Sequence, residues 1–180
     1  MNRLARESAS FAVTVAHSIA AGVILALMFF AWREFVFPVP TVSGPWYCLT
    51  QTTNSDLSDY EDLFLGWRVV LAQSDAGIAG SSEKVWEHGR GRLVGDQIDR
   101  GDVGGFLQYN YLATSRLSVH VDIIPRHTRA STAFYDLRVL GDGLRGTFYW
   151  TSANQRGELV CQRELIDWNN EHVREQLLVQ

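Results

Sequence analysis

Two residue types are nearly missing from this sequence. Lys84 is its one lysine, and Cys48 and Cys161 are its only cysteines. Because most of the chain separates the two cysteines, no metal-binding or redox spacing is present. They are either two buried apolar side chains or, in an oxidising compartment, one disulfide.

Positive charge is also scarce. From Thr41 onward the chain carries 13 basic and 18 acidic residues, a net charge of −5. A domain with this balance has no overall positive field to attract DNA, RNA or anionic lipid. We therefore expect no nucleic-acid polymer as a partner, and any bound anion must be held by a local site.

Catalytic motifs are missing as well. The five histidines are scattered, no two of them stand at a metal-ligand spacing, and neither GxSxG nor HExxH occurs. No nucleophile with an adjacent base can be identified. The sequence therefore predicts a protein that is not an enzyme and holds no metal or cofactor, and an Asp or His pair assembled only by the fold is the remaining catalytic alternative.

One long uncharged run stands near the N-terminus. Phe11 to Trp32 holds no Asp, Glu, Lys or Arg, and as a helix its 22 residues extend about 33 Å, enough to cross a hydrocarbon core of about 30 Å. A signal peptide has a shorter apolar region with a small-residue cleavage site, and a buried core helix is usually shorter. We therefore interpret residues 1–37 as a single-pass transmembrane anchor.

The charges beside this run bear on its orientation. Arg3, Arg6 and the amino terminus precede it, whereas Arg33 alone follows it closely, so the positive-inside rule favours a cytoplasmic N-terminus by about one charge. That orientation places the rest of the chain outside the cytoplasm.

The remainder has the pattern of an all-β domain. Short β-type runs are separated by Gly, Asp and Asn, as in a structure made of hairpins, and no strand–helix–strand spacing occurs. Asp99–Gly105 is expected to be a turn. The nine runs are Trp46–Gln51, Leu65–Gln73, Ile78–Glu87, Arg92–Ile98, Phe106–Thr114, Arg116–Ile124, Ala133–Leu140, Leu144–Thr151 and Glu158–Arg163.

Alternation within these runs indicates how the strands are buried. In Arg116–Ile124, Leu117, Val119, Val121 and Ile123 share one face, and Ala133–Leu140 alternates in the same way. One face is therefore core and the other is solvated. An antiparallel sheet of eight or nine such strands exposes two edges unless it closes, so residues 41–164 are predicted to form a small closed antiparallel barrel of about eight strands.

The last residues have a different pattern. Apolar side chains in Leu165–Val179 recur at the spacing of an amphipathic helix, so residues 165–180 are predicted to form a C-terminal helix or tail that covers the domain or the membrane.

Aromatic residues and arginines recur together in the predicted strands. A cavity wall with both would stack a base and hold a phosphate, whereas the alternative is an aromatic barrel core with a charged exterior. The candidates for base stacking are Tyr109, Tyr111 and Trp150, and those for phosphate binding are Arg68, Arg145 and Arg163.

Four segments carry a resemblance to a known family: Gly44–Tyr47, Gly66–Leu71, Gly143–Tyr149 and Gly157–Arg163. With the anchor before them, they resemble the membrane-anchored β-barrel receptors for cyclic oligonucleotides in bacterial CBASS anti-phage systems. The resemblance implies a lipocalin-like barrel in the bacterial inner membrane that binds a cyclic di- or oligonucleotide, forms homo-oligomers and disrupts membrane lipid. That family usually has two membrane helices, which return the barrel to the cytoplasm, whereas this chain has one.

Two functions therefore stand side by side. The first is a receptor that binds a cyclic nucleotide and acts by oligomerisation at the membrane, and it requires the barrel in the cytoplasm. The second is an extracytoplasmic single-pass barrel that binds a lipid or serves as an assembly subunit, as the flanking charges and the two cysteines favour.

Overall fold

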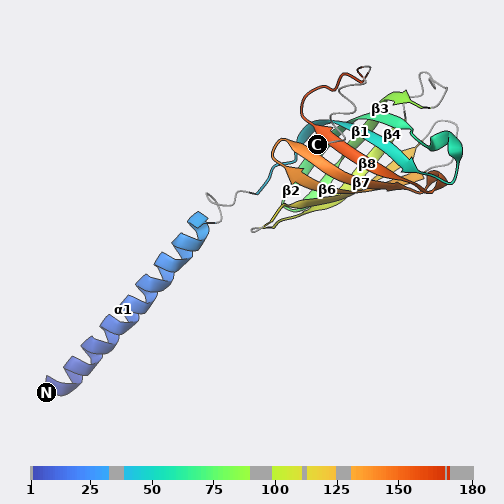
Figure 1. Ribbon diagram of the computed structural model, residues 1–180. Coiled ribbons are helices and arrows are strands. Elements are labelled where there is room, and N and C mark those ends of the chain that lie inside the picture. Colours follow the sequence, from blue (N-terminus) through green and yellow to red (C-terminus); the bar gives the residue numbers. More distant parts are fainter. Residues whose placement is uncertain are drawn as a thin grey trace. The chain divides into compact units, whose positions relative to one another are not determined.

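A computed structural model describes residues 2–32, 39–89, 99–110, 113–124, 131–168 and 170 of the chain. The chain divides into two compact units, Met1–Val39 and Pro40–Gln180. The elements of the second unit are drawn in Figure 1. In order they are β1 (Gly44–Asn54), η2 (Ser58–Tyr60), β2 (Phe64–Ser74), β3 (Gly77–His88), β4 (Arg100–Gln108), β5 (Arg116–Ile124), β6 (Ser131–Leu140), β7 (Gly143–Trp150), η3 (Ser152–Asn154) and β8 (Gln155–Gln162).

In its described residues the first unit contains one helix, α1 (Asn2–Ala31). Its window Thr14–Ala31 has a mean hydropathy of 2.0 and none of it is buried. The helix is long and apolar enough to cross a membrane, and a signal sequence near an N-terminus meets the same criteria.

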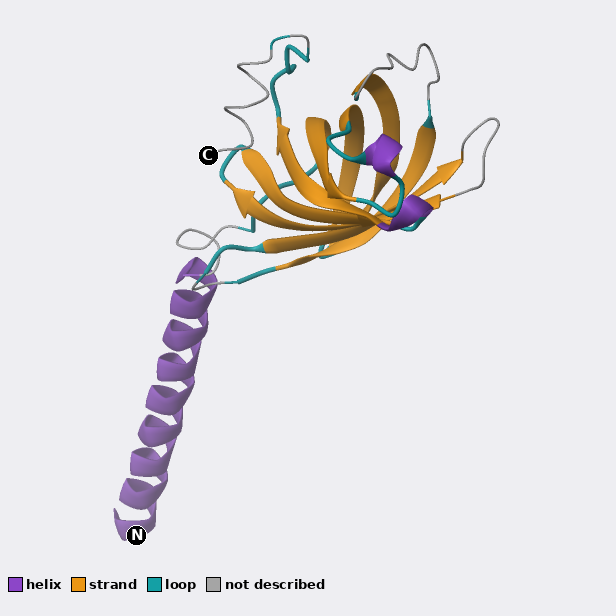
Figure 2. Cartoon of the chain, turned by 45° about the vertical axis from the view of Figure 1, so that its right-hand side comes forward, coloured by secondary structure: helices purple, strands orange, loops and turns teal. Residues whose placement is uncertain are grey.

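The second unit is a closed antiparallel barrel of eight strands, as the sequence predicts. Each strand pairs with the next along the chain, and β8 pairs with β1 to close the sheet. Figure 2 shows the strands as one curved sheet, with the two short 3-10 helices at one end. There Asp56 N donates to Ala153 O at 2.9 Å, which joins the β1–β2 and β7–β8 connections.

The alternation predicted from the sequence is confirmed. Leu117, Val119, Val121 and Ile123 of β5 are buried and belong to the barrel core. On β6, Leu137 is buried while Asp136 and Arg138 are exposed. The core therefore fills the inside of the barrel, and the polar side chains of these strands lie on the outside.

The expected turn at Asp99–Gly105 is wrong, because Arg100–Gln108 is strand β4. Its glycines provide close approach rather than a bend. A Cβ on Gly101 would lie 2.6 Å from Val121 Cγ1, and one on Gly105 would lie 2.7 Å from Val119 Cγ1. Glycine inside a strand often marks such a close contact. The strand predicted over Phe106–Thr114 accordingly ends at Gln108.

Two other predicted elements fall wholly or partly outside the described residues. The run Arg92–Ile98 lies outside them. Of the C-terminal helix predicted over Leu165–Val179, residues 165–168 and 170 are described and are not helical. Ile166 is 2% exposed and the Trp168 ring lies against Gly66 of β2, so this part of the tail packs on the outside of the barrel as irregular chain.

Candidate functional site

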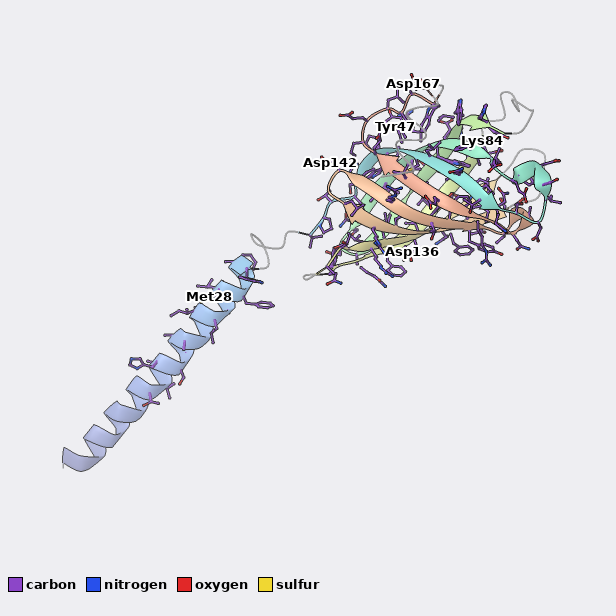
Figure 3. The ribbon with its side chains drawn as sticks, viewed as in Figure 1. Met28, Tyr47, Lys84, Asp136, Asp142 and Asp167 are labelled. Atoms are coloured by element: carbon purple, nitrogen blue, oxygen red, sulfur yellow. A yellow bond between two sulfur atoms is a disulfide. The ribbon has the colours of Figure 1, made fainter. Side chains whose placement is uncertain are left out.

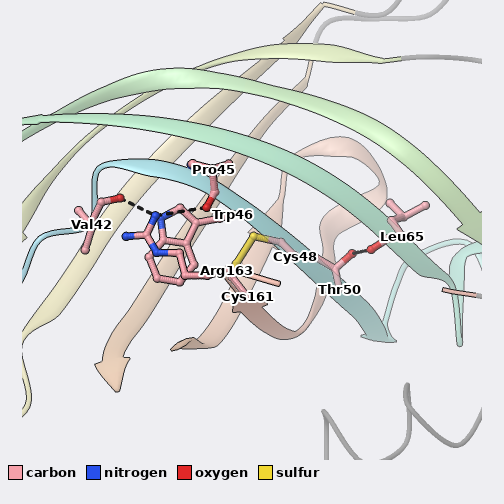
Figure 4. Close-up of a disulfide and its surroundings, with 8 residues drawn as sticks. All are labelled: Val42, Pro45, Trp46, Cys48, Thr50, Leu65, Cys161 and Arg163. Carbon is pink, nitrogen blue, oxygen red and sulfur yellow. Dashed lines mark hydrogen bonds between the residues drawn. A yellow bond between two sulfur atoms is a disulfide. The ribbon is translucent and has the colours of Figure 1, made fainter. Parts of the chain in front are cut away.

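The seam between the first and last strands is covalently closed. Cys48 of β1 and Cys161 of β8 are cross-strand partners, with Cα atoms 4.0 Å apart, and they form a disulfide (Figure 4). Both are buried in the barrel core. Of the two alternatives for the cysteines, the structure therefore has the disulfide.

The segment that leads into the barrel is clamped beside this seam. Arg163 Nη1 donates to Ser43 O at 2.8 Å and Pro45 O at 3.2 Å, and Nη2 donates to Thr41 O at 3.2 Å. Its guanidinium lies 3.7 Å from the ring centroid of Trp46, whose Nε1 donates to Val42 O at 2.8 Å (Figure 4). Burial lowers the pKa of Arg163, and Asp142 opposes that shift. Arg163 thus holds the lead-in segment to the barrel.

The interior of the barrel is almost filled. Its cavity measures about 40 Å³, room for about three water molecules. Trp67 and Trp150 meet edge to face there with centroids 5.7 Å apart, and Trp150 Nε1 donates to Tyr135 Oη at 3.2 Å. Burial raises the pKa of Tyr135, against the lowering effect of that hydrogen bond. The interior is a packed aromatic core and does not have the volume to hold a nucleotide.

The single lysine lies on the interior face of β3, toward the end of the barrel at which β8 begins with Gln155. Lys84 Nζ is 2.9 Å from Glu87 Oε2 and 2.7 Å from Asp99 Oδ2, and its side chain is 11% exposed (Figure 3). Burial by itself lowers the pKa of Lys84, but the hydrogen bonds and charges of Asp99 and Glu87 outweigh it, so the pKa is raised. The three side chains form an internal ionic cluster in which the ammonium group of Lys84 forms ion pairs with both carboxylates.

A broad hollow lies on the outside of β4 to β8. We call it the outer groove and define it by Phe106, His120, Phe134, Tyr149, Arg156 and Glu158, which belong to its lining. Its volume is about 1000 Å³. Phe106 and Phe134 are each 49% exposed, although a soluble barrel usually turns such rings inward.

Cross-strand pairing sets the order of the groove residues. His120 pairs with Phe134, Phe134 with Tyr149, and Tyr149 with Arg156. The rings of Phe134 and Tyr149 stack with centroids 6.4 Å apart, and the Arg156 guanidinium lies 5.4 Å from the Tyr149 centroid. His120 has room because its partner on β4 is Gly104, where a Cβ would lie 2.8 Å from the imidazole. The groove is therefore lined by a continuous row of aromatic side chains, from His120 to Tyr149, with the Arg156 guanidinium at its end.

The residues predicted to bind phosphate lie on different parts of the barrel. Arg163 clamps the lead-in segment, Arg68 is exposed on β2 between Tyr47 and Glu83, and Arg145 is on β7 opposite Arg138. The structure does not bring these three guanidinium groups to one site. Among the described residues, no group of three or more His, Cys, Asp or Glu side chains is placed to hold a metal ion.

The residues predicted to stack a base are also separated. Trp150 is in the interior core, whereas Tyr109 follows β4, where its hydroxyl donates to Asp75 O. Tyr111 lies outside the described residues. None of the described candidates lies in the outer groove.

Sequence reasoning did not single out the outer groove as a site. Phe106, Phe134 and Tyr149 were recognisable as aromatic residues of strands, but alternation alone does not tell which of two aromatic faces is inside. The aliphatic residues of the same strands indicate which face is inside. Leu137 and Val121 mark the inner faces of β6 and β5, and this leaves Phe134 and His120 on the outer faces.

Comparison of the chain with protein-family models, with curated proteins and with solved structures finds no match. The site is therefore interpreted from its own geometry.

Proposed function

We propose that this protein is an assembly subunit whose barrel lies outside the cytoplasm and is anchored by a single membrane-spanning helix. Copies of it associate through the outer groove. The observation that carries the proposal is the pair of contrasting surfaces: an interior with a cavity of about 40 Å³ and an exterior groove of about 1000 Å³ lined by exposed aromatic rings. Exposed aromatic patches of this kind mark interaction surfaces.

Two further observations support the compartment. A disulfide between Cys48 and Cys161 persists in oxidising compartments and is rare in the cytosol. The charges of Arg3 and Arg6 before the uncharged run Phe11–Trp32, against Arg33 after it, favour a cytoplasmic N-terminus. Both favour a barrel on the far side of the membrane, with α1 kept as its anchor.

A second copy of the chain suits the groove because the groove carries both signs of charge. Arg156 and Glu158 lie two residues apart on the outer face of β8. In an isologous interface a twofold axis that crosses β8 between them would set each Arg156 opposite Glu158 of the other copy. The exposed ring of Phe134 and the half-buried ring of Tyr149 would then be covered by the same contact, and anchoring confines the copies to one plane.

The cyclic-nucleotide receptor stays a prediction. A nucleotide would need a site outside the interior, because the interior cavity is too small for a base. It would also need the barrel in the cytoplasm, where a disulfide is not expected to persist.

The test is photo-crosslinking of the full chain in native membranes. With a photo-crosslinking amino acid at Phe134, we expect an adduct of about twice 20.3 kDa, composed of two copies of this chain. The matched control is Val70, which is 42% exposed on the outer face of β2, outside the groove, and should give none. Equal yields at both positions, or no self-adduct at Phe134, would contradict the proposal.

Charge reversal tests the pairing of the two copies. Arg156→Glu or Glu158→Arg alone should lower the self-adduct yield by about tenfold or more, because like charges then face each other across the interface. The double variant Arg156→Glu/Glu158→Arg should restore it, since each pair is rebuilt with the signs exchanged. Failure of the double variant to recover, while its barrel remains folded, would exclude this arrangement.

A further inference from the structure

Three arginines stand side by side on the outside of the barrel. Arg116 of β5 pairs with Arg138 of β6, and Arg138 pairs with Arg145 of β7. We call this set the arginine row. It lies along the same strands as the outer groove but nearer to the end of the barrel at which the chain enters β1.

The arrangement is unfavourable for the barrel alone. Like charges directly opposite each other on adjacent strands are destabilising, with Cβ atoms about 4.5–5.5 Å apart. Arg116 and Arg138 are exposed, and neither forms an ion pair within the described residues. The acidic residues lining the same hollow are Asp136 and Glu158, one register step away, and neither forms an ion pair with Arg116 or Arg138 within the described residues. A bound anion would relieve the repulsion.

An exposed apolar residue adjoins the row. Leu140 is 51% exposed, lines the same hollow and ends β6 two residues after Arg138. The tight turn Gly141–Asp142 follows, with Gly141 at φ +59°, and Asp142 is labelled in Figure 3. An apolar side chain beside guanidinium groups has the composition of a surface that meets the interface of a lipid bilayer.

The row also lies at the tethered end of the barrel. Residues Thr41–Pro45, which lead into β1, are held there by Arg163. Arg116 at the start of β5, Leu140 at the end of β6 and Gly143 at the start of β7 lie at this same end of the barrel. The chain from Trp32 to Gly44 extends at most about 40 Å. A tether of that length keeps the row at a high effective concentration near the membrane surface.

From these observations we propose that the arginine row binds the phosphate groups of anionic lipids in the membrane to which the chain is anchored. The proposal rests on the proposed function for its membrane anchor alone. Guanidinium groups suit phosphate because they present paired donors in a fixed plane. Binding would hold the tethered end of the barrel against the bilayer and leave the outer groove, farther along the same strands, open to a second copy.

The test uses the full chain in micelles of a neutral detergent, titrated with phosphatidylglycerol or phosphatidylcholine and followed by native mass spectrometry. We expect a clear preference for phosphatidylglycerol. Arg116→Gln and Arg138→Gln should each weaken its binding about fivefold, and together about 25-fold. The matched control is Arg100→Gln, which removes the same charge from an exposed residue of β4 that is paired with Glu83. It should leave the binding unchanged.

Competition experiments show whether the arginine row prefers the phosphate of a lipid, inorganic phosphate or a nucleotide. Inorganic phosphate and a cyclic dinucleotide, each added at millimolar concentration, should displace little lipid. Tighter binding of the cyclic dinucleotide than of phosphatidylglycerol, lost in Arg116→Gln/Arg138→Gln, would overturn the lipid proposal in favour of a nucleotide. Equal losses in Arg100→Gln would overturn it too, because they would reflect overall charge.

Failure of the anchor is distinguishable from failure of the row. If α1 is a signal sequence, the protein isolated from cells has a mass below 20.3 kDa, which overturns the proposed anchoring whatever the lipid titration gives. If the mass is intact and phosphatidylglycerol shows no preference, the arginine row proposal alone is overturned.

Discussion

Removing the Cys48–Cys161 disulfide should lower the free energy of unfolding of the barrel by about 4–5 kcal/mol. The bond links residues 113 positions apart, and cross-links that close loops of this length restrict the unfolded chain most. It also crosses the β1–β8 seam, where no chain connection holds the strands together. With the bond lost, this seam is the place where the barrel opens first.

The measurement is urea unfolding of the full chain in neutral detergent, followed by tryptophan fluorescence, with and without reductant. Replacement of both cysteines by alanine should give the reduced stability in either condition, since alanine fills nearly the same small buried volume. An unfolding midpoint of the wild-type chain that does not move on reduction would show that the disulfide contributes nothing, and would contradict this account of the seam.

Replacing Lys84 by methionine should destabilise the barrel by about 3–5 kcal/mol. Glu87 and Asp99, whose side chains are 14% and 22% exposed, would lose the only cation within 4 Å that the described residues provide. Leaving such carboxylates unpaired costs more than losing the attraction itself. The same urea titration measures the effect, and Arg100→Gln, which breaks the exposed ion pair with Glu83, should cost about 1 kcal/mol or less.

A compensated variant separates charge from packing. In Lys84→Met/Glu87→Gln/Asp99→Asn no unpaired charge remains, so most of the lost stability should return. If the triple variant is no more stable than Lys84→Met, packing of the lysine stem rather than charge accounts for the loss.

The raised pKa of Lys84 also gives a pH dependence. Because the folded state holds the proton more tightly than the unfolded state, the contribution of Lys84 is complete below the unfolded pKa of about 10.4 and is lost as the pH rises through the folded pKa above it. The stability difference between wild type and Lys84→Met should therefore shrink at strongly alkaline pH and stay constant between about pH 7 and 9. A difference that shrinks within that neutral range would contradict the assignment.

The barrel was predictable because each hairpin is determined by residues close together in the sequence, namely the alternation within its strands and the turn between them. Leu117 to Ile123 alternate without interruption, and the Gly141–Asp142 turn sets Leu140 opposite Gly143. Closure made a meeting of Cys48 with Cys161 possible, since first and last strands must then pair, but the register that sets them opposite each other could not be derived from the sequence. The hairpins followed from short-range patterns, whereas the disulfide remained one of two alternatives.

The glycines of β4 show why prediction failed there. A glycine that breaks a strand and a glycine that allows Val121 to approach Gly101 look alike in the sequence, because the difference lies in the neighbouring strand. The arginine row was hidden for the same reason. A tight turn sets Arg138 opposite Arg145, but the connection between β5 and β6 does not determine that Arg116 joins them.

The sequence predicted a binding site inside the barrel, whereas the candidate site in the structure lies on its outside. Trp150 was assigned to base stacking because aromatic residues of a small barrel can line a ligand cavity, yet its indole packs against Trp67 and donates to Tyr135. Eight strands of this size are filled by their own side chains when enough of those are aromatic. What then distinguishes this barrel is the set of residues that its outer face leaves exposed, Phe106, Phe134 and Leu140 among them.

The measurement that tests the central claim most directly is a count of free thiols on the full chain taken from native membranes, denatured without reductant in the presence of an alkylating reagent. A barrel that works outside the cytoplasm should yield no reactive thiol before reduction and two after it, because Cys48 and Cys161 are paired. Two reactive thiols before reduction would place the barrel in a reducing compartment, contradict the proposed function, and favour the cyclic-nucleotide receptor instead.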